Sequence, residues 1–90
     1  MEVERYCVID VETTGFRPWA DRIVEVACVL LDGCRVAGRW STLVNPGMPI
    51  PAEATAVHGI TDGMVAAAPE PAFAVHDAAC ACALSRSAEP

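Results

Sequence analysis

The chain opens with an apolar run that passes directly into two acidic residues, Tyr6-Cys7-Val8-Ile9-Asp10-Val11-Glu12-Thr13-Thr14-Gly15. An apolar run of this kind predicts a buried β-strand, in which residues i and i+2 project from one face. The carboxylates of Asp10 and Glu12 are therefore expected side by side at the end of the strand. Like charges held this close repel each other, and carboxylate oxygens are the ligands that Mg²⁺ and Mn²⁺ prefer. The sequence thus predicts a divalent-cation site at Asp10 and Glu12.

The three residues after the acids predict a tight turn beside this site. Taken alone, an Asp-x-Glu pair is more often the solvated start of a loop, so the turn is what favours binding. Thr13 and Thr14 supply two hydroxyls, and Gly15 can adopt a positive φ for a sharp turn. Backbone N–H groups exposed in such a turn can bind a phosphate, and a sugar hydroxyl can bind there too. Thr13, Thr14 and Gly15 are therefore candidate substrate-binding residues.

The composition predicts one small globular domain. The chain has 90 residues, of which 53% are hydrophobic and 20% charged. Its net charge of −6, with six arginines and no lysine, argues against non-specific binding of nucleic acid through a basic surface. It does not exclude nucleic acid as a substrate, because bound cations would supply the positive charge that meets a phosphate.

The cysteines and the amino terminus indicate a cytoplasmic protein. Five cysteines occur, at positions 7, 28, 34, 80 and 82, without a Cys-x-x-Cys pair. This odd set favours free thiols in a reducing compartment over a disulfide framework or a structural zinc site. The first residues do not resemble a signal peptide, and no apolar run approaches the ~18 residues of a membrane span. No membrane partner is expected.

Three strands are expected in the first half of the chain. After the acidic strand, Arg22–Leu31 is β-branched and mostly apolar, which predicts a second strand. Asp32-Gly33 predicts a two-residue hairpin loop, and the third strand then runs from Cys34 or Arg35 to Val44. The three segments together predict an antiparallel meander.

The second half predicts short helices separated by prolines. One helix is expected from Ala52 to about Val57, with Gly59 at its end. Thr61 predicts the N-cap of a second short helix, and a final helix is expected to begin near Ala72.

The last segment of the chain is poorly specified. Helical spacing places Asp77, Cys80 and Leu84 on one face, which is a weak apolar stripe for a helix that covers a sheet. We therefore expect a domain over residues 1–75 and a tail over residues 76–90.

Four blocks of the sequence together resemble a known family. They are VIDVETTG at 8–15, RIVEVA at 22–27, LVNP at 43–46 and VHGIT at 57–61. In this order and spacing they resemble the DEDD-type 3′–5′ exonucleases, in particular the proofreading epsilon subunits of bacterial DNA polymerase III. The resemblance covers roughly residues 5–75 and implies an α/β, ribonuclease H-like fold.

The resemblance implies a metal-dependent nuclease. Two cations, Mg²⁺ or Mn²⁺, would lie about 3.5–4 Å apart and grip the terminal phosphodiester of a DNA 3′ end during replication or repair. Asp10 would bridge both cations and Glu12 would bind one, as the catalytic and metal-binding residues. Thr13 with the turn after it would hold the terminal nucleotide, and His58 would line the nucleotide pocket. A lone histidine in a short helix otherwise fits capping or packing. A DNA polymerase subunit is the implied protein partner.

The sequence also departs from the family. Members carry two further aspartates and a general-base histidine, in motifs resembling Asn-x-x-Phe-Asp and His-x-Ala-x-x-Asp, and neither motif occurs here. His76 and Asp77 are adjacent and cannot imitate that spacing. The later strands of the fold are missing as well, which would leave residues 6–9 as an exposed apolar edge. We therefore expect an incomplete fold, weakly active or inactive, from either a fragment or a reading frame shifted near residue 75, so that the tail is out of frame.

Other functions fit parts of the same pattern. An RNA-trimming exoribonuclease uses the same pair of acids, so the first motif does not distinguish ribose from deoxyribose. A non-catalytic remnant or interaction module would keep the meander and use the acids only as surface. A phosphatase of the aspartyl-phosphate kind fits poorly, because it needs a second aspartate where Glu12 stands.

Overall fold

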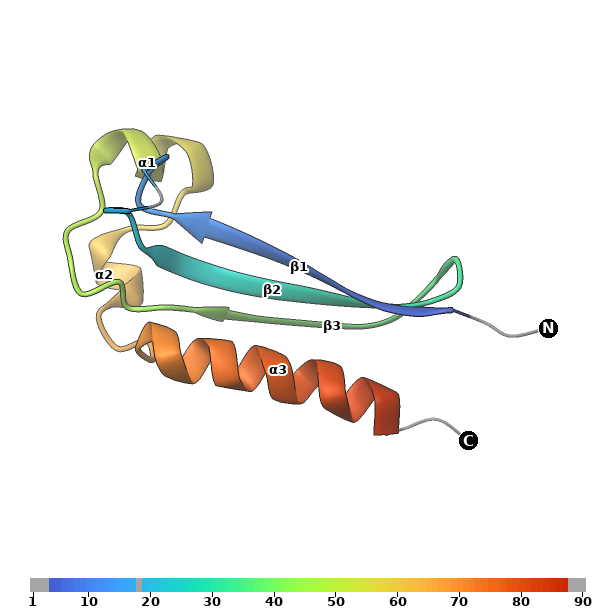
Figure 1. Ribbon diagram of the computed structural model, residues 1–90. Coiled ribbons are helices and arrows are strands. Elements are labelled where there is room, and N and C mark those ends of the chain that lie inside the picture. Colours follow the sequence, from blue (N-terminus) through green and yellow to red (C-terminus); the bar gives the residue numbers. More distant parts are fainter. Residues whose placement is uncertain (1–3, 18, 88–90) are drawn as a thin grey trace.

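The computed structural model describes residues 4–17 and 19–87, with side chains up to residue 80. A three-stranded sheet and three helices make up the described fold (Figure 1). In chain order the elements are β1 (Arg5–Thr13), β2 (Ile23–Asp32), β3 (Arg35–Leu43), α1 (Ala52–His58), α2 (Asp62–Val65) and α3 (Pro71–Ser87).

The sheet is the antiparallel meander that the sequence predicts, with strand order β1-β2-β3. The hairpin between β2 and β3 differs by one residue from the expectation. Asp32 pairs with Arg35, so the two loop residues are Gly33 and Cys34 instead of Asp32 and Gly33. Gly33 has a φ of 64°, the positive value that a two-residue hairpin needs at its first central position in a type II′ turn. Glycine therefore takes the position that only glycine occupies without strain.

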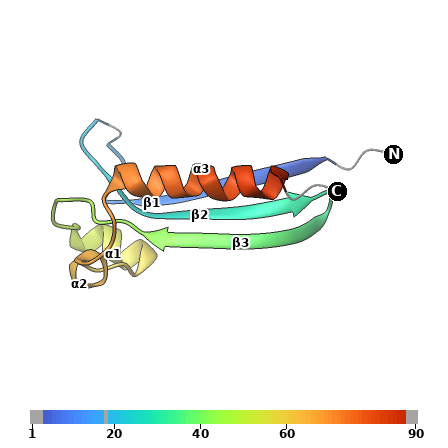
Figure 2. The same cartoon turned by 90° about the horizontal axis from the view of Figure 1, so that it is seen from below.

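Helix α3 covers one face of the sheet, over β2 and β3 (Figures 1 and 2). The core between them consists of Val26, Cys28, Val44, Ala74 and Ala78, with Trp40 packed against it. The predicted stripe of Asp77, Cys80 and Leu84 is wrong at its first two positions, which are exposed, and the Leu84 side chain lies outside the described residues. The helix instead presents alanines to the sheet, and small side chains allow a close approach.

The chain beyond residue 75 has a regular backbone as far as the structure describes it. Helix α3 continues through residues 76–87, and residues 88–90 of the expected tail lie outside the described residues. An alanine-rich composition favours helix, because alanine loses no side-chain entropy there.

Helices α1 and α2 pack at the end of the sheet where β1 ends. A second core cluster lies here and consists of Val24, Ile50, Ile60 and Val65. The predicted helix boundaries are confirmed by the caps: Gly59 ends α1 with a φ of 76°, and the Thr61 hydroxyl accepts a hydrogen bond from the N–H of Met64 at 3.4 Å. This end of the molecule also carries the turn that follows the acidic residues.

Strand β1 lies at an edge of the sheet, and its apolar side chains are half exposed. Tyr6 is 53% exposed, Val8 49%, Ile9 53% and Val11 41%. The expectation of a buried strand is therefore wrong for β1, and the expectation of an exposed apolar edge is confirmed. The reason is that α3 packs chiefly against β2 and β3, whereas among the β1 side chains it is Cys7 that packs against the core beneath the helix.

The cysteines follow the sequence expectation only in part. Cys28, Cys34 and Cys80 are free thiols, and burial raises the pKa of the Cys28 thiol. Cys7 is disulfide-bonded, so the expectation of free thiols is wrong there. An odd number of cysteines does not decide whether two of them meet in the fold.

Within the described part of the chain, none of the helices has the length and apolarity needed to cross a membrane.

The packing of α3 gives a first prediction. Ala78 is 4% exposed and lies against the sheet, whereas its neighbour Ala79 is exposed. We expect Ala78→Leu to lower the free energy of unfolding by about 1–3 kcal/mol, because the larger side chain forces the helix off β2. The matched change Ala79→Leu should alter it by less than about 0.5 kcal/mol. Urea unfolding of both variants measures the difference, and equal effects would show that α3 does not pack through this face.

Candidate active site

The two acidic residues lie on the open face of β1. Val11 pairs with Val26, and Val26 belongs to the core beneath α3. Since side chains alternate along a strand, Asp10 and Glu12 project from the opposite face, away from α3. Asp10 is exposed and Glu12 is half-buried. The prediction that these two carboxylates share one face is therefore confirmed.

A third carboxylate lies across from them on β2. Glu25 is the direct cross-strand partner of Glu12. From the sequence alone Glu25 is interpreted as a partner of Arg22 or a solvent-facing residue, because only the register of the two strands reveals this pairing. Like charges directly opposite each other in a sheet are destabilising. The open face at the end of β1 is therefore strongly acidic.

Neither carboxylate of the pair has a protein partner among the described residues. No hydrogen bond or ion pair reaches the side-chain carboxylate of Asp10 or Glu12 within the part of the chain that the structure describes. In the same part, no group of three or more acidic, histidine or cysteine residues is arranged to hold a metal ion. The carboxylate oxygens of Asp10 and Glu12 are of the donor type that a hard divalent cation prefers.

The turn after β1 is held together by Thr14 and Asp21. Thr14 is 1% exposed, and its hydroxyl donates to Asp21 Oδ1 at 2.9 Å and accepts the N–H of Arg22 at 3.0 Å. The Thr14 N–H donates to the carbonyl of Arg22 at 2.8 Å, and the Gly15 N–H donates to the Thr13 hydroxyl at 3.3 Å. The expectation of free donors in this turn is therefore wrong for Thr14 and Gly15, because the turn uses them itself.

Gly15 is needed for space and not for its φ. Positive φ occurs at Gly33, Gly47 and Gly59, and Gly15 is not among them. A Cβ atom on Gly15 would lie 2.6 Å from Oδ2 of Asp21, which is closer than any real contact. The expectation of a positive φ at Gly15 is thus wrong, and the close approach of Asp21 is the physical reason for glycine here.

Asp21 is the organising residue that the sequence does not reveal. Its side chain is only 3% exposed, although it lies in a surface loop. Oδ2 accepts the Arg17 N–H at 2.8 Å and lies 3.3 Å from Arg17 Nε. The Arg17 N–H, with help from the Arg17 guanidinium and the Thr14 hydroxyl, holds the pKa of Asp21 below its usual value against the effect of desolvation. An acid seven residues after Thr14 is a weak signal, since loops are rich in aspartate.

A cavity of about 730 Å³ adjoins the acids and the turn. Glu12 and residues 13–17 form one side of it, and α1 forms the other through Glu53, Ala54, Val57 and His58. Asp10 lies two residues before Glu12 on the same face and does not line the cavity. The cavity thus brings together Thr13, Thr14, Gly15 and His58, the four predicted substrate-binding residues.

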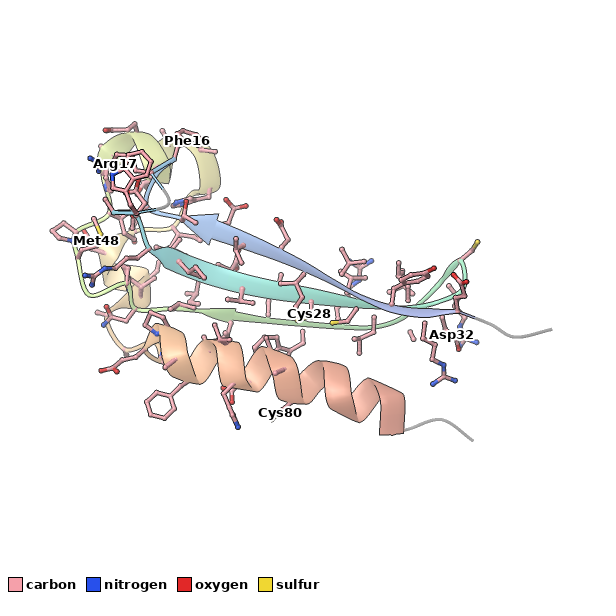
Figure 3. The ribbon with its side chains drawn as sticks, in the orientation of Figure 1. Phe16, Arg17, Cys28, Asp32, Met48 and Cys80 are labelled. Carbon is pink, nitrogen blue, oxygen red and sulfur yellow. The ribbon has the colours of Figure 1, made fainter. Side chains whose placement is uncertain are left out.

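Phe16 and Arg17 project beside α1 at this cavity (Figure 3). Phe16 is 97% exposed, which is unusual for a large aromatic side chain without a partner. The sequence places both residues only in a loop, and no local signal distinguishes them from ordinary loop residues.

His58 ends α1 and contacts the backbone on both sides of its ring. Nε2 lies 3.0 Å from the carbonyl oxygen of Thr13, and Nδ1 accepts the N–H of Ile60 at 3.0 Å. His58 therefore joins the wall of the cavity to the end of β1. Both ring nitrogens of His58 therefore already contact backbone groups.

Comparisons with known proteins identify the same region. Residues 7–79 match the family described as Exonuclease (RNase T). Over 67 residues the chain is 58% identical to a DNA polymerase III subunit epsilon-like protein of Rhodobacter capsulatus, covering 71% of this chain and 10% of that protein. Over 61 residues it is 52% identical to an uncharacterized exonuclease of Escherichia phage 186, covering 68% of this chain and 29% of that protein.

Two solved structures are similar. Exonuclease X, in complex with 5′ overhanging duplex DNA, superposes with a TM-score of 0.63 at 39% identity and covers 73% of this chain and 37% of that chain. A full-length 3′-exonuclease superposes with a TM-score of 0.75 at 20% identity, covering 86% of this chain and 28% of that chain. The fold is thus part of a ribonuclease H-like fold, and the chain spans about a third of each structure.

The space around Gly15 gives a second prediction. Gly15→Ala places a methyl group against the Asp21 carboxylate, so the turn must shift, and we expect a loss of about 1–3 kcal/mol in the free energy of unfolding. Gly63→Ala is the matched control, because its nearest atom is 4.0 Å away, and it should stabilise slightly by removing a helical glycine. Urea unfolding compares the two variants, and an unharmed Gly15→Ala would contradict the close approach.

The Asp21 carboxylate gives a third prediction, on pH. Its pKa is lower in the folded chain than the ordinary value of 3.8, so the stabilisation is fully present above 3.8 and is lost as pH falls through the folded pKa. Asp21→Asn removes this charge. We therefore expect Asp21→Asn to melt at a lower temperature than the natural chain at pH 7, and this difference to shrink below pH 3.8. Thermal melts across pH 2–7 measure it, and a difference independent of pH would contradict the charge-based cause.

Proposed function

Because the chain belongs to the exonuclease family, we propose that it carries out metal-dependent 3′–5′ hydrolysis of the terminal phosphodiester bonds of DNA as part of a longer domain. Members of this family generally use divalent metal ions. The observation that carries the proposal is the pair of carboxylates, Asp10 and Glu12, which no side chain or backbone group of the described residues bonds, on one open strand face beside a cavity of nucleotide size.

The acids fit divalent cations by their chemistry. Asp10 and Glu12 present oxygen ligands side by side, and Glu25 adds a third negative charge opposite Glu12. A cation would neutralise repulsion that the described protein groups leave uncompensated. In the proposed site Asp10 and Glu12 would hold two ions, Mg²⁺ or Mn²⁺. Such ions activate a water and stabilise the leaving oxygen of a phosphodiester.

The cavity provides the place for the terminal nucleotide. Its walls come from the turn at residues 13–17 and from α1, so a nucleotide held there lies next to Glu12. The exposed ring of Phe16 offers a face on which a base can stack, and Arg17 adds a positive charge near the phosphates. The walls of this proposed substrate site include Thr13, Thr14, Gly15 and His58. Most polar groups of these residues already form hydrogen bonds within the protein.

The relatives favour DNA as the polymer. The Rhodobacter capsulatus relative is named for the epsilon subunit of DNA polymerase III, and the solved structure of exonuclease X contains duplex DNA. We extend both properties to this chain as proposals, namely a DNA 3′ end as substrate and a DNA polymerase subunit as partner. With both, we propose that the protein acts in replication or repair.

The number of ligands suggests where the activity resides. Two carboxylates from this chain leave most positions around two cations to other groups. The chain spans 37% of exonuclease X and 28% of the full-length 3′-exonuclease. We therefore propose that residues 1–75 correspond to the amino-terminal part of an exonuclease domain, and that full turnover requires the rest of such a domain.

Metal-dependent stabilisation gives a fourth prediction and tests the proposal. Mn²⁺ at ten times its Kd should stabilise the folded chain by about 1.4 kcal/mol, seen as a rise in Tm. Asp10→Ala should abolish the rise, because one of the two ligands is gone. Asp77→Ala is the control, since Asp77 is an exposed acid on α3, and it should leave the rise unchanged.

The same measurement separates the alternatives. With Mn²⁺ present, dAMP should raise Tm further, and by more than AMP does if deoxyribose is preferred. Equal rises would favour an exoribonuclease relative. No Mn²⁺ effect in the natural chain, or the same effect in Asp10→Ala, would reject the metal site and leave a non-catalytic module.

A further inference from the structure

His58 is held by two hydrogen bonds that fix the chemical form of its ring. The Ile60 N–H can only donate, so Nδ1 at 3.0 Å must present a lone pair. The Thr13 carbonyl oxygen can only accept, so Nε2 at 3.0 Å must carry a proton. The two contacts together require the neutral imidazole with its proton on Nε2.

The same contacts attach α1 to the rest of the molecule. None of the residues of α1 is buried, and Ala54 is the α1 residue that packs, partly buried, against the second core cluster. The turn at Gly59, which has a φ of 76°, brings the Ile60 N–H back to the His58 ring, and Ile60 itself is anchored at 4% exposure in the core. The opposite side of the ring reaches Thr13, the residue after Glu12. His58 thus links the core, the helix and the end of the acidic strand.

We infer that His58 is a positioning residue of the proposed exonuclease site: as a neutral imidazole it fastens α1 to the end of β1 and sets the width of the cavity beside Glu12. This inference rests on the proposed function, because the consequence we expect from it is a change in nucleotide affinity. It goes beyond that function by assigning His58 a role through Thr13 and not through the substrate.

The geometry argues against three more familiar roles for this histidine. A general base or a metal ligand needs a free lone pair, and the lone pair on Nδ1 receives the Ile60 N–H. A cation that binds phosphate needs a second ring proton, which would point at that same N–H and break the contact. The charged residues that line the same cavity are Glu12, Arg17, Asp21 and Glu53, and neither ring nitrogen is bonded to any of them in the described structure.

Three substitutions separate the two contacts. His58→Gln can place an amide N–H where Nε2 lies and keep the bond to Thr13. His58→Asn can place an amide oxygen where Nδ1 lies and keep only the bond from Ile60. His58→Phe keeps the ring shape and loses both bonds. Asp10 and Glu12 are untouched in all three variants.

The test combines ring spectroscopy with nucleotide binding in the full 90-residue chain. In ¹⁵N-labelled protein at pH 7.5, the His58 ring should show a protonated Nε2 and an unprotonated Nδ1, both before and after Mn²⁺ and dAMP are added. His58→Gln assigns the signals, and the exposed His76 is the reference. By calorimetry, dAMP affinity in the presence of Mn²⁺ should fall about tenfold in His58→Phe and His58→Asn, and less than about threefold in His58→Gln. Mn²⁺ affinity should stay within about twofold in all three.

The outcomes are separable from those of the proposed function. A proton on Nδ1, or a doubly protonated ring when dAMP binds, would overturn the inference in favour of direct contact with the nucleotide. Equal losses in His58→Gln and His58→Phe would overturn it as well, because the bond to Thr13 would then not matter. If the natural chain binds neither Mn²⁺ nor dAMP, the proposed function fails, and the inference fails with it as a statement about nucleotide affinity. The ring signals then report only whether His58 fastens α1.

Discussion

The antiparallel pairing of β1 with β2 is the constraint from which the site follows. The register aligns Val11 with Val26 and therefore turns Asp10 and Glu12 to the face that α3 leaves open. It also sets Glu25 directly across from Glu12. A shift of one residue would send the acids toward the core, where unpaired charges are far more costly. The acidic character of this face thus depends on the register of β1 and β2 as well as on the three acidic residues themselves.

A small network of hydrogen bonds then turns the end of β1 into one wall of a cavity. Asp21 holds the loop through hydrogen bonds with Thr14 and Arg17. His58 connects it to α1 through its contact with Thr13. Almost all of these bonds run to backbone groups or to buried hydroxyls. The polar groups of the loop therefore bond mainly to one another, and the acidic strand face and the exposed ring of Phe16 are left for contact with a ligand.

Much of this arrangement could be predicted from local signals. Alternation along a strand predicts that Asp10 and Glu12 share a face, and Gly59 and Thr61 mark helix ends because their roles depend only on adjacent residues. The residues that the sequence left unexplained act over longer distances. Asp21 matters because the fold returns it to Thr14, and Gly15 is required because Asp21 approaches it. The roles of Glu25 and His58 likewise depend on strand register and on helix docking, which no local pattern specifies.

Strand β1 has apolar side chains on both faces and forms the edge of the sheet in the described part of the chain, and the acids lie on that same strand. Any segment that adds itself along this edge would exclude water from the carboxylates as it covers Val8 and Ile9. Lower local polarity strengthens the attraction between a carboxylate and a cation. In the proposed site, the addition of such a segment and the binding of metal would therefore favour each other, so that extending the sheet would also raise the affinity of the acids for cations.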